Sequence, residues 1–216
     1  MDKFTQELAN TIKVTDKKLI IGVSGHGAAG KTTFTNRLIN LLGKKEINYV
    51  NTDPYIIDSG VRNHATIDYI YQNENHRYKM TACHPSAHHL SSLERDVQMV
   101  REGLNFCTID THYMRSKLIS SEKNITIVEG MSVAFLDSAL FDLTIYFYTD
   151  GETELRRRST RDIDERGRKI NELRQSHEER RIQYEVFMHP YSQNFDVVVK
   201  MVNEQVIFEK VSFDIK

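Results

Sequence analysis

A glycine-rich segment at residues 25–33, with the sequence GHGAAGKTT, constrains the fold of this chain more than any other feature. It follows an apolar run at residues 19–23 and precedes residues 34–42, whose apolar side chains recur at helical spacing. A strand, a glycine turn and a helix in this order form a phosphate site, because backbone N–H groups and the helix N-terminus point toward one anion. The sequence therefore predicts a polyphosphate-binding site here.

The fixed positions of this segment match the pattern Gly-x4-Gly-Lys-Thr of phosphate-binding loops. Lys31 is expected to reach the β- and γ-phosphate oxygens of a nucleotide, and the Thr32 hydroxyl to ligate the magnesium ion that accompanies them. The predicted nucleotide-binding residues of the loop are Gly25, Gly27, Ala28, Ala29, Gly30, Lys31, Thr32 and Thr33. The expected cofactors are ATP and Mg²⁺, and the loop by itself does not distinguish ATP from GTP.

The chain has 216 residues, enough for one sizeable core, and a formal net charge of −1. A balanced charge provides no broad basic field, so neither nucleic acid nor membrane is expected as a partner, and a small molecule is. The two cysteines, Cys83 and Cys107, lack the spacing of a disulfide framework or a zinc site. Charged residues throughout positions 2–18 exclude the apolar core of a signal peptide, so we expect a cytoplasmic protein.

Short apolar runs, rich in β-branched and aromatic residues, alternate with helical or irregular stretches along the chain. The predicted strands are residues 19–23, 47–50, 125–128, 143–148 and 197–199. This alternation predicts an α/β fold in which a mostly parallel sheet is flanked by helices. Phe4, Leu8 and Ile12 predict a short amphipathic helix before the first strand, whereas the polar residues 59–90 are interpreted as a loop with a short helix.

Two acidic residues follow predicted strands, and parallel strands place their carboxyl ends along one sheet edge. Asp53 follows the second run, where a carboxylate can hold magnesium through water or accept a proton from an attacking hydroxyl. An Asx turn or helix cap at Asp53-Pro54 is the alternative. Glu129 follows the third run and is predicted to orient the water shell of magnesium, with a solvent-facing strand end as the alternative.

A basic segment follows the fourth predicted strand, and its local charge is +4, from seven basic and three acidic residues. The basic residues are Arg156, Arg157, Arg158, Arg161, Arg166, Arg168 and Lys169. Arg157 and Arg158 lie within one helical turn of Arg161, which predicts a lid helix that presents guanidinium groups to the nucleotide phosphates. A solvated charged helix face is the alternative, and Gly167 favours a hinge or turn.

Two polar clusters lie outside these motifs. His84 and His88 have the i, i+4 spacing of a helical metal site, but no acidic or cysteine co-ligand stands at matching spacing, so a metal site is disfavoured. The second cluster consists of Asp110, His112, Tyr113 and Arg115. It is interpreted either as a site that hydrogen-bonds a hydroxylated substrate or as a surface loop.

Four segments, taken in order, resemble the uridine kinase branch of the phosphoribulokinase and uridine kinase family. They are IGVSGHGAAGKTT at 21–33, NTDPY at 51–55, IVEG at 127–130 and FYTDGETELRRRSTRDIDERGR at 147–168. The last segment is the most specific, because it is similar to the arginine-rich lid of that family. The resemblance covers nearly everything after Lys18, and it implies a P-loop NTPase fold. We expect a single kinase domain, residues 1–216, with a lid insertion at approximately residues 151–185.

The resemblance also implies roles for individual residues. Asp53 would be the base that activates the 5′-hydroxyl of a nucleoside sugar, and the lid arginines would contact phosphates or substrate. Where the family usually reads Phe-Asp-His-Pro-Asp-Ala, residues 82–87 read Ala-Cys-His-Pro-Ser-Ala, so Cys83 replaces an acid expected to hold the ribose hydroxyls. A thiol accepts such hydrogen bonds poorly. The predicted substrate-binding residues are Asp53, Tyr55, Cys83, His84, Asp110, His112, Arg115, Arg166 and Arg168.

Together these features predict an ATP- and Mg²⁺-dependent kinase that transfers the γ-phosphoryl group to the 5′-hydroxyl of a pyrimidine nucleoside, uridine or cytidine. Lys31, Asp53 and Arg161 are the predicted catalytic residues, Arg157 and Arg158 are assigned to the nucleotide, and Thr32 and Glu129 to the metal. The alternatives are a kinase of the same fold for another hydroxylated metabolite, such as a sugar phosphate or pantothenate, and a nucleotide-binding module without transfer activity. The sequence leaves a homo-oligomer open.

Overall fold

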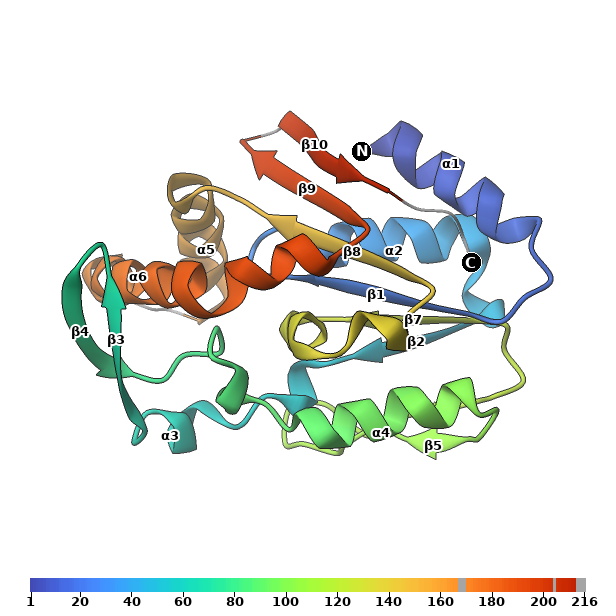
Figure 1. The fold of residues 1–216 in the computed structure, drawn as a ribbon, viewed down its shortest axis with the longest axis horizontal. Helices are drawn as coiled ribbons and strands as arrows, with labels where there is room; N and C mark the ends of the chain where they lie inside the picture. The colour runs from blue at the N-terminus through green and yellow to red at the C-terminus, as the bar shows by residue number, and fades with distance from the viewer. Residues whose placement is uncertain (167–169, 204, 213–216) are drawn as a thin grey trace.

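The computed structural model describes residues 1–166, 170–203 and 205–212, and within residues 161–175 only the course of the backbone (Figure 1). Its centre is a six-stranded sheet with the order β10-β9-β8-β1-β7-β2. The strands are β1 Leu19–Gly25, β2 Ile47–Asn51, β7 Ile125–Glu129, β8 Leu143–Tyr148, β9 Val197–Val202 and β10 Gln205–Val211. Neighbours are parallel except β10, which is antiparallel to β9. The predicted mostly parallel sheet and its five strands are confirmed, and β10 is an addition.

Alternating side chains of the strands divide the core into two layers. On β8, Leu143, Ile145 and Phe147 belong to one layer, whereas Tyr146 and Tyr148 belong to the other. Both faces are buried, because helices cover both sides of a parallel sheet, and the strands therefore read as nearly continuous apolar runs. Each fully buried side chain of this size contributes roughly 1.5–3 kcal/mol to folding.

Helices cover both faces of the sheet. One layer receives Leu8 from α1 Asp2–Lys13 and Leu38 from α2 Lys31–Leu42, which confirms the predicted N-terminal amphipathic helix. The opposite layer is covered by α4 Leu90–Arg101, the 3₁₀ segment η4 Met131–Phe135 and the π-helix η6 Tyr184–Met188. Figure 1 shows α4 far from α1, on the other side of the strands.

Two further helices, α5 Gly151–Arg166 and α6 Ile170–Gln183, follow β8 and occupy the predicted lid segment. Residues 167–169 between them include the predicted hinge residue Gly167 and lie outside the described residues. The remaining short elements are η1 Lys44–Glu46, η2 Asp53–Tyr55, η3 Pro85–Ala87, the paired β5 Phe106–Cys107 and β6 Leu118–Ile119, η5 Ser138–Leu140 and η7 His189–Asn194.

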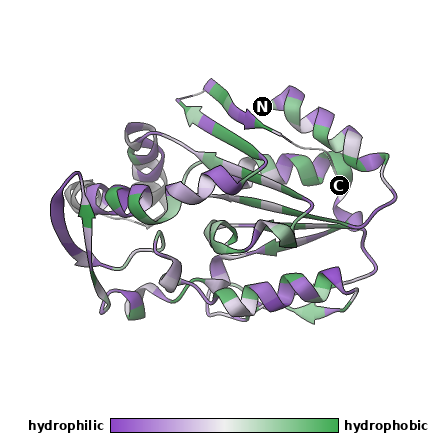
Figure 2. Cartoon of the chain, viewed as in Figure 1, coloured by the Kyte–Doolittle hydropathy of each residue, from purple (hydrophilic) through white to green (hydrophobic). Residues whose placement is uncertain are grey.

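The polar segment 59–90 differs from the predicted loop with a short helix. It contains the short helix α3 Ser59–Arg62, but twelve of its residues form an antiparallel hairpin of β3 Thr66–Tyr71 and β4 Glu74–Lys79. The turn residues Gln72 and Asn73 have φ angles of 51° and 67°. Asn-Gly is the usual sequence at two turn positions with this conformation. The hairpin was not predicted from the sequence because its turn lacks glycine and β4 lacks alternating apolar residues. Figure 2 shows the hydrophilic character of β4.

Helix α6 holds the hairpin, which lies beside it in Figure 1. The Tyr69 hydroxyl donates a hydrogen bond to Glu179 (2.7 Å). The Gln183 amide donates to the Lys79 carbonyl (2.9 Å), and its side-chain oxygen accepts from the backbone N–H and the hydroxyl of Thr81. The base of the hairpin is therefore fixed against the lid helices.

The carboxyl ends of β1, β2 and β7 meet at one edge of the sheet. Glu129, the last residue of β7, lies opposite Val23 of β1 and Asn51 of β2. The glycine loop after β1 and the Asp53 segment after β2 are consequently brought together. This is the edge at which open α/β sheets bind ligands.

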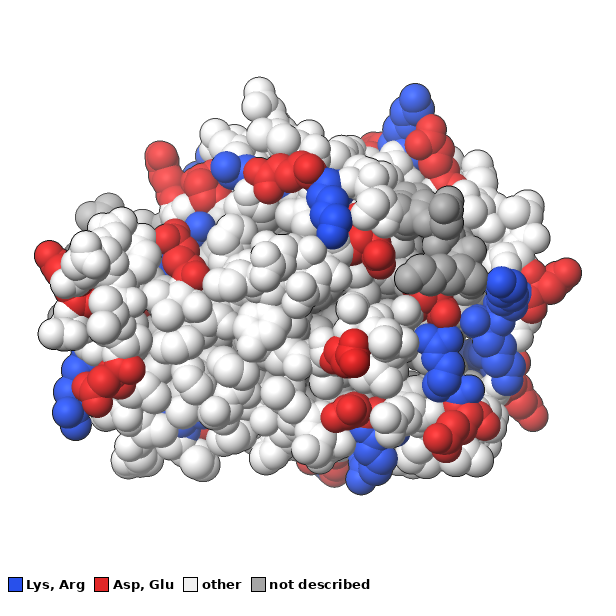
Figure 3. All heavy atoms as spheres, in the orientation of Figure 1, with Lys and Arg blue, Asp and Glu red and all other residues white. Residues whose placement is uncertain are grey.

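Charged side chains of both signs are interspersed on the face shown in Figure 3 and leave a broad uncharged middle. In the described part of the chain, no helix has the length and apolar character needed to span a membrane. Within the same part, no group of three or more His, Cys, Asp and Glu residues is arranged to hold a metal ion.

His88 is buried between the sheet-edge segments, and both of its ring nitrogens have partners. Nε2–H donates to the Ala82 carbonyl (2.9 Å) and Nδ1 accepts from the Ser132 hydroxyl (2.8 Å), so neither nitrogen is available to a metal ion. Burial lowers the pKa of His88 from 6.5 to about 4. Between these pH values the unfolded chain binds a proton that the folded chain does not. The free energy of unfolding therefore falls as the pH is lowered from 6.5 to 4.

We expect the free energy of unfolding to fall by up to about 3 kcal/mol through His88 when the pH is lowered from 7 to 4. Urea unfolding followed by circular dichroism at each pH measures this decline. In His88→Gln the decline should be shallower, whereas the exposed His64→Gln should keep the wild-type slope. Equal slopes in wild type and His88→Gln would contradict the assignment.

Candidate active site

The glycine loop passes directly into α2. Gly30, just before Lys31, has a φ of +100°, and Gly25 has a φ of +135°, conformations that favour glycine. A Cβ at Gly25 would also collide with the carbonyl oxygen of Phe147. The Lys31 side chain is 8% exposed and donates to the His26 carbonyl (2.9 Å), so its ammonium group is held over the loop. The N-terminus of α2 and this ammonium group together favour an anion.

A buried carboxylate stands beside the loop. The Thr32 hydroxyl donates to the two oxygens of Glu129, at 3.2 and 3.3 Å. Tyr49 on β2 donates to the same carboxylate (2.6 Å), so Glu129 faces Thr32 instead of solvent. Mg²⁺ takes hard oxygen ligands and keeps several waters, so one hydroxyl and one carboxylate fit this ion.

A cavity of about 570 Å³, named here the central cavity, lies between the loop, the segment after β2 and the lid helices. Asp53 lines it, and within the described residues the Asp53 carboxylate makes no hydrogen bond or ion pair. The Asx turn at this point belongs to Asn51, whose side chain accepts from the Asp53 N–H (2.7 Å). The Tyr113 hydroxyl donates to the Asp53 carbonyl (3.0 Å). A carboxylate thus faces open space next to the loop.

Charges of both signs meet in the central cavity. Burial lowers the pKa of Lys31, and the negative charges of Glu129 and Asp53 oppose this effect. Arg158 and Arg180 also approach the loop, since a Cβ on Gly27 would lie 3.7 and 3.8 Å from their guanidinium nitrogens. The cavity can therefore hold phosphate oxygens between a lysine and two arginines while Asp53 remains beside them.

A second cavity, of about 630 Å³, lies on the other side of the loop next to α1 and is named here the N-terminal cavity. Apolar side chains supply part of its wall, including Phe34, Met201 and Val206. Arg157 also lines it and donates to the carbonyls of Ala28 (3.1 Å) and Asn203 (2.7 Å). Three loop residues, Ala28, Lys31 and Thr32, line both cavities.

Beneath the loop, Glu154 of α5 is 2% exposed. It forms ion pairs with Arg158 (3.2 Å) and Arg181 (3.5 Å) and lies 3.5 Å from Nδ1 of His26. Burial alone would raise the pKa of Glu154, but the hydrogen bond from His26 and the positive charges of Arg158 and Arg180 lower it overall. Nε2 of His26 accepts from the Thr149 N–H (2.9 Å), and burial lowers the pKa of this histidine, so it is neutral with the proton on Nδ1.

Two of the predicted substrate-binding residues are buried in the core and do not line the central cavity. Tyr55 is fully buried and its hydroxyl donates to Asp96 (2.5 Å). Cys83 is 1% exposed in the same apolar layer, where burial raises the pKa of its thiol. Their placement is a correction to the predicted site, because packing against α4 and the sheet takes up both side chains. His84 accepts from the Ser86 N–H (3.1 Å) at the start of η3 and does not line this cavity either.

The predicted polar cluster is divided by the fold. His112 and Tyr113 line the central cavity. Asp110 and Arg115 are exposed and pair with each other (3.4 Å), as the surface-loop interpretation expects.

The predicted loop and lid residues are placed as follows. Gly27, Ala28, Gly30, Lys31, Thr32 and Thr33 each line at least one of the two cavities, whereas Gly25 and Ala29 are buried. Arg157 and Arg158 of α5 reach the loop. Arg161 and Arg166 lie on α5 but their side chains are outside the described part, as is the whole of Arg168.

Three residues of this region, Arg62, Arg180 and Glu154, were not identified from the sequence. Arg62 lies in a short polar segment, and Arg180 lies beyond the arginine-rich stretch in a helix with charges on all sides. Glu154 could have been found from its i, i+4 spacing to Arg158. The other two are brought to the cavity only by the packing of α3 and α6.

Comparison with known proteins agrees with this architecture. The model of the Phosphoribulokinase / Uridine kinase family matches residues 20–208. The chain therefore belongs to the phosphoribulokinase and uridine kinase family, and family membership supports a phosphotransferase.

The chain is 23% identical over 204 residues to a phosphoribulokinase from Synechocystis sp., an alignment that covers 91% of this chain but 58% of that protein. It is 28% identical over 217 residues to a uridine kinase from Limosilactobacillus reuteri, an alignment that covers 95% of this chain and 94% of that protein. The structure of phosphoribulokinase from Rhodobacter spheroides superposes with a TM-score of 0.61 at 16% identity, covering 87% of this chain and 71% of that one. The superposition with that structure shows that the two chains share the P-loop kinase fold.

We expect Glu154→Gln to destabilise the protein by about 3 kcal/mol, because Arg158 and Arg181 would lose their buried counter-charge. Urea unfolding at pH 7 measures this change. The matched control is Glu152→Gln on the same helix, which is exposed and should change stability by less than about 0.5 kcal/mol. Equal stability of the two variants would show that Glu154 does not hold the loop and lid together.

Proposed function

We propose that this chain is an ATP- and Mg²⁺-dependent phosphotransferase whose acceptor is a hydroxyl group of a small molecule. The observation that carries the proposal is the pair of cavities that meet at Lys31 and Thr32. A nucleotide whose base and sugar occupy the N-terminal cavity would end its phosphate chain at the loop. An acceptor in the central cavity would then meet the terminal phosphate beside Asp53.

Different residues of this chain bind the phosphates and the metal ion of the donor nucleotide. Lys31 and the N–H groups of the loop hold the β- and γ-phosphates, and Thr32 and Glu129 would hold the metal ion, whose positive charge would offset that of these phosphates. Arg157 fixes α5 to the loop through two carbonyls. Arg158 adds positive charge beside Gly27, and Arg161 on the same helix is the proposed catalytic arginine.

Asp53 is the proposed base. Its carboxylate accepts the proton of the acceptor hydroxyl, and the acceptor oxygen forms a bond to the γ-phosphorus. The bond from that phosphorus to the oxygen that bridges it to the β-phosphorus breaks, so ADP leaves and a phosphate monoester is formed. A module that only binds nucleotide would not need an unpaired carboxylate at this position, which favours transfer over the non-catalytic alternative.

The 5′-hydroxyl of a pyrimidine nucleoside, uridine or cytidine, is the acceptor that the motif resemblance and the uridine kinase relatives support. His112 and Tyr113 supply polar and aromatic groups to the cavity that such a ligand would enter. A second acceptor class, another hydroxylated metabolite such as a sugar phosphate or pantothenate, is favoured by Cys83. This residue is buried, so it cannot hold the ribose hydroxyls as the acid of the family does.

Asp53→Asn should lower kcat by about 10²- to 10⁴-fold and leave the KM for ATP nearly unchanged, because an amide cannot accept the proton. ADP release in a coupled assay measures both constants. The control is Asp16→Asn, an exposed carboxylate outside the cavities that should keep wild-type rates. Retention of most activity in Asp53→Asn would exclude Asp53 as the base.

The acceptor is tested by ADP release with uridine, cytidine, pantothenate and sugar phosphates at equal concentration. We expect at least one of them to raise ADP release about tenfold or more above the rate with ATP alone, because a bound hydroxyl competes with water at the terminal phosphate. Tight ATP binding without stimulation by any acceptor would contradict transfer and favour the binding module.

A further inference from the structure

A third cavity, of about 180 Å³, adjoins the central cavity and is named here the hairpin cavity, because the end of β4 forms one wall. Its volume is more than ten times the ~15 Å³ that one water needs. It shares Ser59, Arg62, Arg158 and Arg180 with the central cavity, so the two form one continuous cleft. None of the loop residues lines the hairpin cavity.

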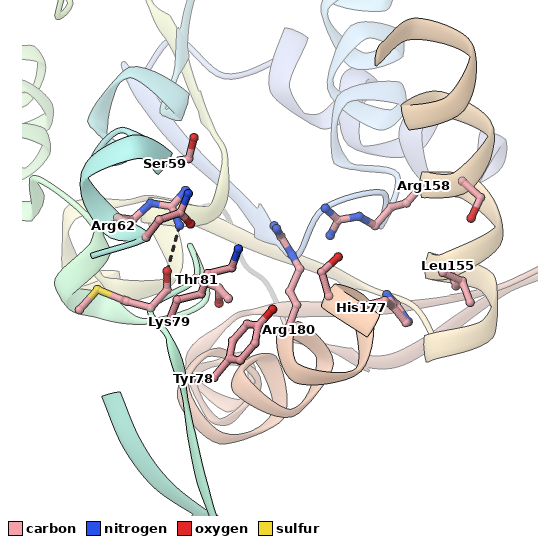
Figure 4. Close-up of a pocket in the computed structure, with 13 residues that line it drawn as sticks. Ser59, Arg62, Tyr78, Lys79, Thr81, Leu155, Arg158, His177 and Arg180 are labelled. Atoms are coloured by element: carbon pink, nitrogen blue, oxygen red, sulfur yellow. Dashed lines mark hydrogen bonds between the residues drawn. The ribbon is translucent and has the colours of Figure 1, made fainter. Parts of the chain in front are cut away.

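The hairpin cavity is cationic. Arg62, Lys79, Arg158 and Arg180 line it, and among the described residues no Asp or Glu does. Figure 4 shows the side chains of Arg62, Arg158 and Arg180 converging on the same space from three different helices. The carboxylates of the cleft, in contrast, line the central cavity: Asp53, Asp58 and Glu129. The central cavity also contains Lys31 and the three shared arginines, so it carries charges of both signs, whereas the charged residues that line the hairpin cavity are all positive in the described part of the chain.

Arg180 is the least satisfied of these cations. Its Nε is buried and has no hydrogen-bond partner in the described part of the chain. Arg62 donates to two carbonyls, Ile57 (2.7 Å) and Met80 (3.3 Å), which satisfy its N–H groups but do not neutralise its charge. Burial, followed by the positive charge of Arg180, lowers the pKa of Arg62. Two partly buried guanidinium groups thus repel each other, and the carboxylates nearest in charge, Asp58 for Arg62 and Glu154 for Arg180, do not line the hairpin cavity.

A bound anion would remove this electrostatic cost. Guanidinium groups match the oxygens of a phosphate or carboxylate, and bonds between charged groups are about twice as strong as neutral ones. Ser59 and Asn63 add neutral side chains to the same wall. Water would supply hydrogen bonds to these groups but no negative charge.

We propose that the hairpin cavity binds the anionic end, a phosphate monoester or a carboxylate, of a hydroxylated acceptor whose reacting hydroxyl lies at Asp53. This inference rests on the proposed phosphotransfer function and specifies its substrate class. The nucleotide phosphates are a separate anion, because they are held at the loop. A neutral nucleoside would place no negative charge against Lys79 and the arginines of the hairpin cavity.

Matched acceptors test the substrate class. D-ribose 5-phosphate is compared with D-ribose, and D-glycerate with glycerol, alongside uridine and cytidine, by ADP release. At least one anionic member should exceed its neutral partner about 100-fold or more in kcat/KM, and the pair that responds distinguishes phosphate from carboxylate. Equal or greater turnover of uridine and the neutral members would overturn the proposal.

Variants test the position of the anion. Arg180→Gln should raise the KM for the anionic acceptor about 10- to 100-fold, because it removes charged hydrogen bonds. Lys79→Gln should raise it less and leave kcat and the KM for ATP unchanged, since Lys79 lines the hairpin cavity but not the central one. The matched control is Arg77→Gln on the same strand, whose side chain is 74% exposed and pairs with Asp68.

Calorimetry tests anion binding in the hairpin cavity independently of phosphotransfer. Inorganic phosphate is titrated into protein saturated with ADP and Mg²⁺, so that the loop is already filled. It should bind wild type and Arg77→Gln equally, Lys79→Gln more weakly and Arg180→Gln at least tenfold more weakly. Unchanged binding in Lys79→Gln would place the anion at the loop and overturn the proposal. Binding with the expected pattern but no turnover of any acceptor would contradict the phosphotransfer function while supporting the anion site.

Discussion

The buried carboxylate of Glu154 connects the phosphate-binding loop to the lid. It contacts a neutral histidine of the loop and pairs with one arginine from each lid helix, Arg158 and Arg181. An unpaired carboxylate at this depth would cost several kcal/mol, so the loop and both helices are held to one relative arrangement. This arrangement in turn directs Arg158 and Arg180 toward the cleft, and it fixes the base of the hairpin through α6.

The charges of the cleft differ between its two cavities. The carboxylates of Asp53, Asp58 and Glu129 line the central cavity together with Lys31, whereas the charged residues that line the hairpin cavity are all positive in the described part of the chain. Under the proposal above, a ligand with a hydroxyl at one end and an anion at the other would be bound with its anion in the hairpin cavity. Such alignment lowers the barrier by positioning the hydroxyl before reaction. The relatives of this chain include kinases named for different substrates, and one fold can carry different functions.

The central strands were predictable because burial on both faces makes them nearly continuous apolar runs, and every residue of β8 is buried. The β3–β4 hairpin was not, since its strands are largely exposed and its Gln72-Asn73 turn lacks the usual glycine. Its stability comes from contacts with α6, a helix about a hundred residues later in the chain. A pattern confined to neighbouring residues cannot report such a contact.

The sequence by itself determined the phosphate-binding loop, the acid after β2 and the acid that ends β7, because glycine conformation, helix polarity and strand ends are local properties of the chain. Only the tertiary structure decided that Tyr55 and Cys83 are packed in the core and that Arg62 and Arg180 enter the cleft. Burial and cavity lining depend on how distant helices pack against the sheet. The physical reason is that burial and charge pairing depend on contacts between elements that are far apart in the sequence. The spacing of residues along the chain reports only the faces of one helix or strand.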